Sequence, residues 1–404
     1  MSAIISYLFS GRQGAGIDMP SVKVHCVETD PDKRARCLKH LLKANHVNYS
    51  IIYNDLRFDN HNVHILCSAY LLGATEDQLH AIYNSEIQEL EPWVPSPSEL
   101  IDEDWRDFLG DGRFQRAYLD FFEDKLAIDY AYDWRPELRH YLLGGERPLL
   151  HGLIGGLGHP LIHLAYAYEM DSREVAMEAL ALASSQYNFF HKYLDEASFT
   201  RPSPIESESG TPLQLLERLS KDERFAHIPG DAPLDGLEKL FEDNESIILE
   251  YWNALGFDEP RRQFELCQQA AVALFVATVR PGTDLYNFFV VHLLTTSHAV
   301  RVLLSFLPAE HHVSLVREWW LLMLAIFIIR GRPLPDDENL DEDLKGRTWK
   351  HVEHRALASE WSEDAHFVKA LRAMKEAAET WGDVDERYLQ SAVTFADNFS
   401  GWSF

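Results

Sequence analysis

The sequence predicts an all-α protein, and three observations favour this fold class. Apolar residues recur at the spacing of one helical face along most of the chain. Capping residues, glycine and proline bound these stretches. Strand-like alternation is scarce, and there is no internal repeat or low-complexity segment. We therefore expect one large, bundle-like helical domain that spans residues 1–404.

The overall charge limits the kind of partner. The chain has 404 residues, with 37 Lys and Arg against 64 Asp and Glu, which gives a formal net charge of −27. Nucleic acids and anionic membrane surfaces need a basic footprint, so we expect neither as a partner. Hydrophobic residues make up 46% of the chain, which is enough to bury a sizeable core.

Cysteine usage and hydropathy suggest a compartment. Four cysteines without a Cys-x-x-Cys pair indicate free thiols in a reducing environment. Residues 1–10 lack the basic start of a signal peptide. The apolar run Trp319–Ile329 is shorter than the about 20 residues that a bilayer crossing needs. We expect this run to be a core helix of a soluble, cytoplasmic protein, and the sequence leaves the oligomeric state open.

Helical patterns follow one another along the chain. Asn60 can cap a helix that Gly73 ends, for example, and Pro160 suits the first position of another. Helices are expected over residues 32–45, 60–73, 105–133, 159–169, 173–194, 237–255, 261–279, 284–307 and 349–380. Two segments break this pattern. Residues 200–235, with several prolines, are expected to be an irregular lid or loop, and residues 331–345 an acidic surface loop.

A glycine-rich turn runs into a helix that carries histidines at apolar positions. The turn has Gly-x-x-Gly-Gly-x-Gly spacing over residues 152–158, with no preceding strand and no following Lys-Ser or Lys-Thr, so a dinucleotide or phosphate loop is excluded. His159 is expected at the helix start, and His163 lies one turn further along the same face. Imidazoles at this spacing suit a divalent transition metal.

Further histidines and one lysine occupy other apolar helical stretches. His61 and His64 share a face in the first turn of their helix. His298 lies among apolar residues, whereas His292, six positions earlier, points away from the face of His298. Lys369 falls on the apolar side of the last long helix. In the same helix, Arg372 and Lys375 are expected to turn outward.

Helical bundles build metal sites from inward side chains on facing helices, so these residues predict a histidine-rich mononuclear site in the core. There is no Glu-x-x-His pair for a di-iron site and no nucleophile elbow. The alternative is that the histidines are structural and bond to backbone carbonyls. A helical binding protein would then be the better interpretation.

Several motifs resemble those of the questin oxidase-like family. They are Asn-His-x-x-His-x-Leu at 60–66, the glycine–histidine stretch at 151–164, Thr-Ser-His-Ala-Val-Arg at 296–301, Asp-x-His-x-x-Lys-Ala-x-Arg-Ala at 364–373 and Gly-Trp-x-Phe at 401–404. The resemblance covers nearly the whole chain. It implies an enzyme that opens rings of anthraquinone-type polyketides in secondary metabolism, with O₂ and a flat aromatic compound as substrates. One branch of the family is described as a non-haem iron oxygenase whose metal is held by four histidines and a carboxylated lysine.

The resemblance also implies roles for individual residues. The iron, as Fe(II) or Fe(III), would be held by His64, His159, His163, His298 and Lys369, with His61 as the alternative to His64. Lys369 would carry a CO₂-derived carbamate, which needs a neutral amine, and burial favours that state. His151 would orient a ligand imidazole, and Thr296 would touch O₂ or substrate.

Three functions follow from these observations. The first is a non-haem iron oxygenase that cleaves a ring carbon–carbon bond of an anthraquinone or hydroquinone. The second is a Baeyer–Villiger-type oxidase that uses NADPH from a partner or from solution as external reductant. The chain has no nicotinamide or flavin fingerprint of its own, which argues against this second function. The third is a non-catalytic helical binding protein.

Overall fold

The computed structural model describes residues 16–205, 210–230, 234–279, 283–334 and 343–404. The all-α prediction is confirmed, because the described chain is mostly helical with two very small sheets. The main helices are α2 (Lys33–Asn48), α3 (Asn62–Leu71), α4 (Glu76–Glu86), α5 (Gln115–Ile128), α6 (Trp134–Leu143), α7 (His159–Met170), α8 (Arg173–Ser185), α9 (Lys192–Asp195), α10 (Pro212–Ser220), α11 (Leu237–Ala254), α12 (Pro260–Ala277), α13 (Val290–Leu303), α14 (His312–Ile329), α15 (Trp349–Ala358), α16 (Ala365–Trp381) and α17 (Arg387–Asn398).

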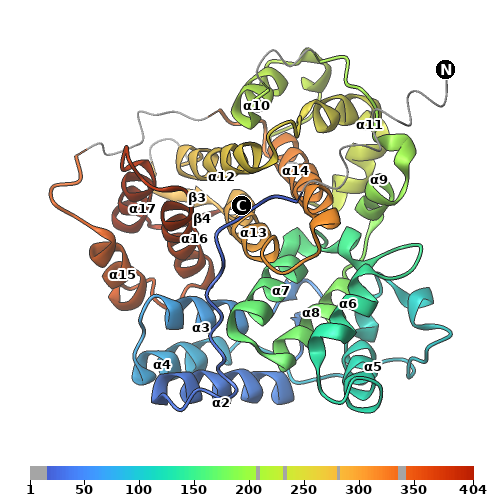
Figure 1. Ribbon diagram of the computed structural model, residues 1–404. Coiled ribbons are helices and arrows are strands. Elements are labelled where there is room, and N and C mark those ends of the chain that lie inside the picture. The colour runs from blue at the N-terminus through green and yellow to red at the C-terminus, as the bar shows by residue number, and fades with distance from the viewer. Residues whose placement is uncertain (1–15, 206–209, 231–233, 280–282, 335–342) are drawn as a thin grey trace.

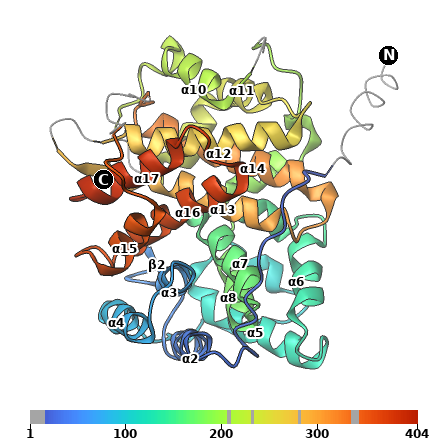
Figure 2. The ribbon, with the colours of Figure 1, turned by 60° about the vertical axis from the view of Figure 1, so that its left-hand side comes forward.

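Helices α7 and α13 lie at the centre of the molecule (Figures 1 and 2). Helix α13 packs against α7, α12, α14 and α16, while α7 also packs against α3 and α8. Every residue of α7 and of α13 is buried, so neither helix has a solvent-facing side. The buried apolar residues of the described chain form one contiguous cluster around them.

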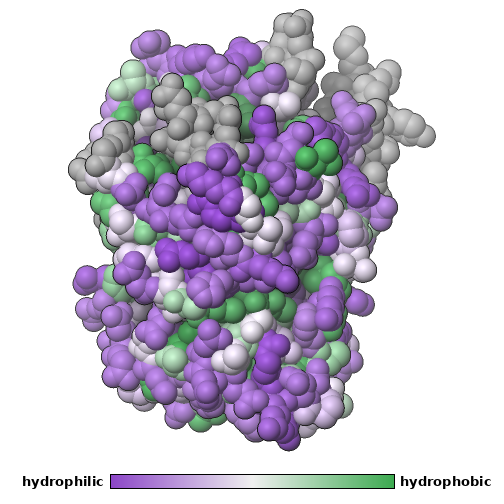
Figure 3. Space-filling view, turned by 90° about the vertical axis from the view of Figure 1, so that its left-hand side faces the viewer, coloured by the Kyte–Doolittle hydropathy of each residue, from purple (hydrophilic) through white to green (hydrophobic). Residues whose placement is uncertain are grey.

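Helix α14 contains the long apolar run. Residues Ala309–Ile329 are long and apolar enough to cross a membrane, but 83% of the most apolar window is buried inside the protein. Helices α10, α11, α12 and α13 cover it on several sides. The expectation of a core helix is therefore confirmed. The surface of the protein, by contrast, is largely hydrophilic on the face that Figure 3 shows.

The two ends of the described chain lie against this core. Residues 16–27 form a strap across α13 and α7 (Figure 1), held by bonds from His25 N to Glu169 O at 2.6 Å and from Ile17 N to His312 Nδ1 at 2.9 Å. Strand β4 (Gly401–Ser403) pairs in parallel with β3 (Leu285–Asn287), just before α13. The other sheet is the hairpin of β1 (Ile52–Tyr53) and β2 (Phe58–Asp59), just before α3.

The structure corrects several element boundaries. The helix expected from residue 284 begins at Val290, after strand β3. The helix expected over 349–380 is two helices, because residues 359–364 turn and the Asp364 carboxylate caps α16. Helix α10 lies inside the segment expected to be irregular, where Thr211 and Gln214 form a capping box. The first turn of α3 begins after His61, which is its N-cap residue. Most of the expected acidic loop lies outside the described residues.

Candidate metal centre

Four histidines from four separate helices meet in the core. Among the described residues, the ligating nitrogens of His61, His159, His292 and His366 all lie within 4.8 Å of one another. The Nε2 atoms of His159 and His61 are 2.9 Å apart, and those of His366 and His292 are 3.3 Å apart. The structure therefore brings together residues whose positions in the sequence run from 61 to 366.

Each of these histidines lies at the N-terminus of a helix. His61 is the N-cap of α3, His159 begins α7, His292 is the third residue of α13 and His366 is the second residue of α16. The N-terminus of a helix carries a partial positive charge. Four such ends around one point favour neutral imidazoles and a negatively charged group beside them.

Hydrogen bonds fix the tautomers of two of the rings. His159 Nδ1 bonds to Gly156 O, and His292 Nδ1 bonds to Phe288 O at 2.9 Å. A carbonyl oxygen can only accept, so each Nδ1 carries the hydrogen and each Nε2 keeps its lone pair. Both lone pairs belong to the nitrogens that face the other histidines.

This donor set fits a transition metal. Two nitrogens bound at right angles to one ion, with bonds of about 2.1 Å, lie about 3 Å apart. The two Nε2–Nε2 separations, 2.9 and 3.3 Å, are close to this value. Imidazole ligands must also be neutral, and burial lowers the pKa of His159 to about 3 and the pKa of His61, His292 and His366 well below the ordinary value.

Two further groups stand beside the histidines. Asp59 Oδ2 is 3.2 Å from His159 Nδ1, Gln186 donates to Asp59 Oδ1 at 2.6 Å, and burial raises the pKa of Asp59 to about 7. Lys369 lies one turn after His366 on α16 and is 2% exposed. Its Nζ has no hydrogen-bond partner among the described residues, and burial lowers its pKa to about 7.

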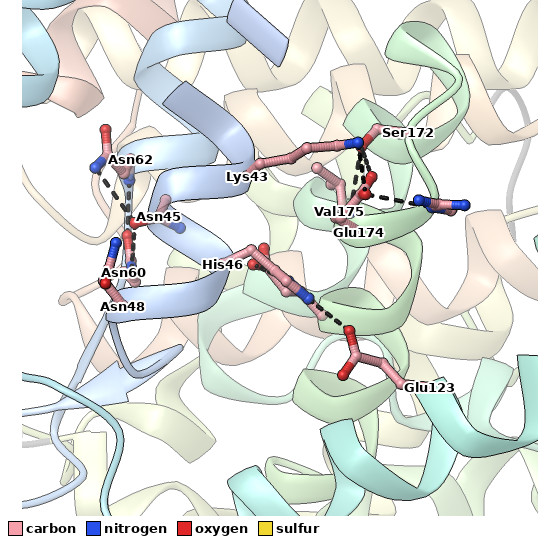
Figure 4. Close-up of polar contacts among 12 residues, drawn as sticks. Lys43, Asn45, His46, Asn48, Asn60, Asn62, Glu123, Ser172, Glu174 and Val175 are labelled. Atoms are coloured by element: carbon pink, nitrogen blue, oxygen red, sulfur yellow. Dashed lines mark hydrogen bonds and ion pairs between the residues drawn. The ribbon is translucent and has the colours of Figure 1, made fainter. Parts of the chain in front are cut away.

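Two of the predicted ligands, His64 and His163, lie outside the four-histidine group and bond to each other. His64 Nε2 is 3.2 Å from His163 Nδ1, while His163 Nε2 is 2.7 Å from Glu178 Oε2. Glu178 Oε1 bonds in turn to His46 Nδ1 at 2.8 Å, and His46 Nε2 bonds to Glu123 at 2.7 Å (Figure 4). This buried chain gives His163 Nε2 a carboxylate partner, and its Nδ1 faces His64 rather than the four-histidine group.

Another two predicted residues lie on α13. His298 falls six residues after His292, so it lies on another face of the helix, and neither of its ring nitrogens has a partner among the described residues. Thr296 lies one turn after His292, donates to the carbonyl oxygen of His292 at 2.5 Å and accepts from Trp319 Nε1 at 3.1 Å. The Thr296 hydroxyl is thus already engaged in positioning α13.

His151 stands apart from the group. Its Nδ1 is 2.7 Å from Asp195, which also holds His191 at 2.7 Å, and its Nε2 is 3.4 Å from the Ser314 hydroxyl. It therefore bonds to none of the four histidines. Of the residues expected in the site, the group contains His159 and His61, the alternative to His64.

Sequence reasoning missed His292 and His366, although a signal for both was present. Asn287 accepts bonds from the first amides of α13, and Asp364 does the same for α16. In each case the histidine follows a capping residue within the first turn. For His159 the signal is different, since Pro160 suits the first turn of a helix.

Comparison with known proteins gives the family. The model of the questin oxidase-like family matches residues 58–374, a segment that contains all four histidines and Lys369. The chain belongs to the questin oxidase-like family. The resemblance that the motifs predicted is thereby confirmed.

Curated relatives of this family are oxidases from fungi. The chain is 26% identical to the Baeyer-Villiger oxidase AgnL3 of Paecilomyces divaricatus over 85% of this chain and 78% of the relative. It is 24% identical to the questin oxidase of Aspergillus fumigatus, over 86% and 82%, and 31% identical to the oxidoreductase AflY of Aspergillus parasiticus, over 83% and 71%. This member of the questin oxidase-like family is therefore an oxidoreductase of secondary metabolism rather than a non-catalytic binding protein.

Proposed function

We propose that the protein is a non-haem iron oxygenase that uses O₂ to cleave a ring carbon–carbon bond of an anthraquinone- or hydroquinone-type polyketide. One observation carries this proposal: four neutral imidazoles, opening four helices, turn their nitrogens toward one point in the core. The ligand set is His61, His159, His292 and His366. It replaces His64, His163 and His298 of the sequence-based set.

Lys369 completes this set as a carbamate. Its position one turn after His366, its burial and its unpartnered Nζ support a neutral amine beside the histidines. Carbamate formation joins the amine nitrogen to the carbon of CO₂ and releases one proton. The resulting anion would lie among four positive helix ends, which stabilise negative charge.

Iron bound to this set would supply the oxygen chemistry, and the protein controls orientation and access to water. The backbone carbonyls of Gly156 and Phe288 hold His159 and His292 in position through their Nδ1 hydrogens. Asp59 supports His159 from the side, so that the ring keeps one orientation.

Aromatic side chains beside the histidines support a flat aromatic substrate. The Phe288 ring centroid is 4.6 Å from that of His366 and 4.8 Å from that of Phe404, while Trp402 is 5.9 Å from His366. Pairing of β4 with β3 holds Trp402 in this place. A planar polyketide would find ring faces and edges to stack against here.

The test combines metal analysis with isotope labelling. Purified protein is expected to contain about one iron per chain, and anomalous scattering at the iron edge should place it between the four histidines. Turnover under ¹⁸O₂ with an anthraquinone such as questin should put both oxygen atoms into the ring-opened product. Protein that binds no iron even after anaerobic reconstitution would contradict the proposal.

The names of several relatives favour a second candidate, a Baeyer–Villiger-type oxidase with NADPH as external reductant. That reaction inserts one oxygen atom beside a carbonyl and reduces the other to water, with one NADPH consumed per product. A single ¹⁸O atom in the product, with stoichiometric NADPH oxidation, would establish this candidate instead.

A further inference from the structure

Three of the four helices that meet at the histidines continue away from them side by side. Helix α13 packs against both α7 and α16, and each of the three begins at the histidine group. One turn beyond the histidines, three residues on, the helices carry Ile162, Thr295 and Lys369. Successive helical turns therefore form layers between the same three helices.

A narrow cavity lies between these layers. Its volume of about 10 Å³ is enough for one water-sized molecule. Thr295 and Lys369, one turn beyond the histidines, line one part of the cavity. The other part is lined one turn further on by an alanine from each helix: Ala165, Ala299 and Ala373. Side chains no larger than a methyl group keep this space open where three helices pack.

Two buried polar side chains also line the cavity. Lys369 and His298 are 2% and 7% exposed, and Lys369 Nζ and both His298 ring nitrogens lack hydrogen-bond partners among the described residues. Buried polar atoms are almost always satisfied, so unsatisfied atoms around one cavity indicate that a small molecule enters it.

A second cavity lies next to the narrow one. It measures about 370 Å³, is lined by residues 20–23 and 25 of the strap, and shares two lining residues, His298 and Glu169, with the narrow cavity. The ion pair of Glu169 with Arg372 holds Glu169 at the junction. A route through both cavities would run from the strap, past His298, to Lys369.

We propose that this route is an entry passage for a small uncharged molecule, O₂ or CO₂, to the metal centre, separate from the entry of the organic substrate. The inference rests on the proposed function. The narrow part excludes any ring-bearing compound by size. The same volume, enough for one water-sized molecule, leaves no room for an ion with its hydration shell.

The kinetic test uses a larger side chain on one wall of the narrow cavity to fill it. Ala373→Leu should lower kcat/KM for O₂ by about tenfold, because the added side chain overpacks the path, while kcat/KM for the organic substrate at saturating O₂ stays unchanged. Ala377→Leu is the matched control, since Ala377 is equally buried on α16 but lines neither cavity. Iron content is measured for both variants.

A second arm distinguishes CO₂ from O₂. Metal-free Ala373→Leu is titrated with Fe(II) at several bicarbonate concentrations. If the passage serves CO₂, this variant should need more bicarbonate than Ala377→Leu to bind the same iron, with unchanged O₂ kinetics once loaded. If the passage serves O₂, the two titrations should coincide and the O₂ kinetics should differ.

A third measurement does not depend on activity. Crystals of the wild-type protein under xenon pressure should show a xenon atom between Lys369 and His298, and crystals of Ala373→Leu should not. If xenon binds there but the protein shows no ring-cleaving activity, the passage proposal stands and the proposed function is wrong. The passage proposal is wrong if the wild type binds no xenon. It is also wrong if Ala373→Leu and Ala377→Leu agree in both the O₂ kinetics and the Fe(II) titration.

Discussion

The Nε2 atoms of His61 and His159 lie 2.9 Å apart, although the two residues are separated by 98 positions in the sequence. The bond from His159 Nδ1 to Gly156 leaves a lone pair on His159 Nε2. In the metal-free protein the hydrogen between the two rings must therefore sit on His61. A bound metal would replace that hydrogen, so this contact marks a site where a cation is favoured.

Substitution of two histidines on α13 should affect iron binding differently. His292→Ala is expected to lower iron affinity more than the about 10–100-fold typical of residues that only orient a ligand, because it removes a ligand. His298→Ala, at another buried position of α13, should keep the iron. Iron per chain, measured by elemental analysis, checks this. Iron lost from His298→Ala but kept by His292→Ala would restore the sequence-based ligand set.

The turn before α7 should not tolerate a side chain. At Gly158, where φ is +82°, an added Cβ would lie 2.4 Å from Thr296 Cγ2. Gly158→Ala should therefore push α7 from α13, displace His159 and weaken iron binding. Gly346→Ala is the control, because Gly346 has a similar φ of +77° with nothing within 4 Å. It should show only the backbone cost of about 1–2 kcal/mol.

Stability should depend on pH through the buried pair of Glu178 and His46. Burial opposes the charge on Glu178, but hydrogen bonds from His163 and His46 outweigh it and lower the Glu178 pKa to about 2. The stabilisation is then present above about pH 4.5 and is lost as the pH falls toward 2. Bonds to Glu123 and Glu178 likewise raise the His46 pKa to about 10 against burial, so its contribution is present below about pH 6.5 and is lost as the pH rises toward 10.

Urea unfolding midpoints across this range test the pair. His46→Gln should flatten the alkaline limb and lower the plateau between about pH 4.5 and 6.5. His40→Gln, on the exposed side of the same helix, should leave the curve unchanged. An alkaline limb that persists in His46→Gln would contradict the assignment.

Arg372 and Lys375 should differ sharply in their effect on stability. Arg372 is 1% exposed and pairs with the buried Glu169, contrary to the expectation that it faces outward. Arg372→Met leaves a buried carboxylate unpaired and should cost about 3–5 kcal/mol of unfolding free energy. Lys375→Met removes more exposed pairs and should cost about 0–1 kcal/mol. Equal denaturation midpoints for the two variants would show that the buried pair contributes little.

The aromatic group beside the histidines should affect substrate affinity alone. Phe288→Leu removes a ring whose centroid is 4.6 Å from that of His366 and should raise KM for the aromatic substrate by up to about tenfold, with iron content unchanged. Phe306→Leu, whose ring stacks on Tyr168, is the control. Steady-state kinetics give KM for both variants, and an equal KM for the two would contradict the prediction.

The sequence predicts most of the helices because caps and periodicity are local properties. It failed between Trp349 and Trp381, where the turn at 359–364 interrupts a pattern that reads as continuous. The capping box at Thr211 was a local signal too, and the prolines around it concealed the helix that it begins.

The choice of ligands could not be made from pattern alone. A helix with one exposed side shows which positions face inward, but every residue of α7 and of α13 is buried. Periodicity shows that His292 and His298 face different ways without showing which of them meets α3 and α16. That information lies in long-range packing, and the carboxylate that occupies His163 comes from another helix as well.

The placement of the histidines at helix starts also affects how the protein is assembled. No segment that omits residue 61 or residue 366 contains the complete set, so a high-affinity site can arise only after α3 has docked on α16. A cation held there would act as a cross-link between distant parts of the chain. Chelators should accordingly lower the midpoint of thermal unfolding and speed proteolysis, even where no ligand side chain is changed.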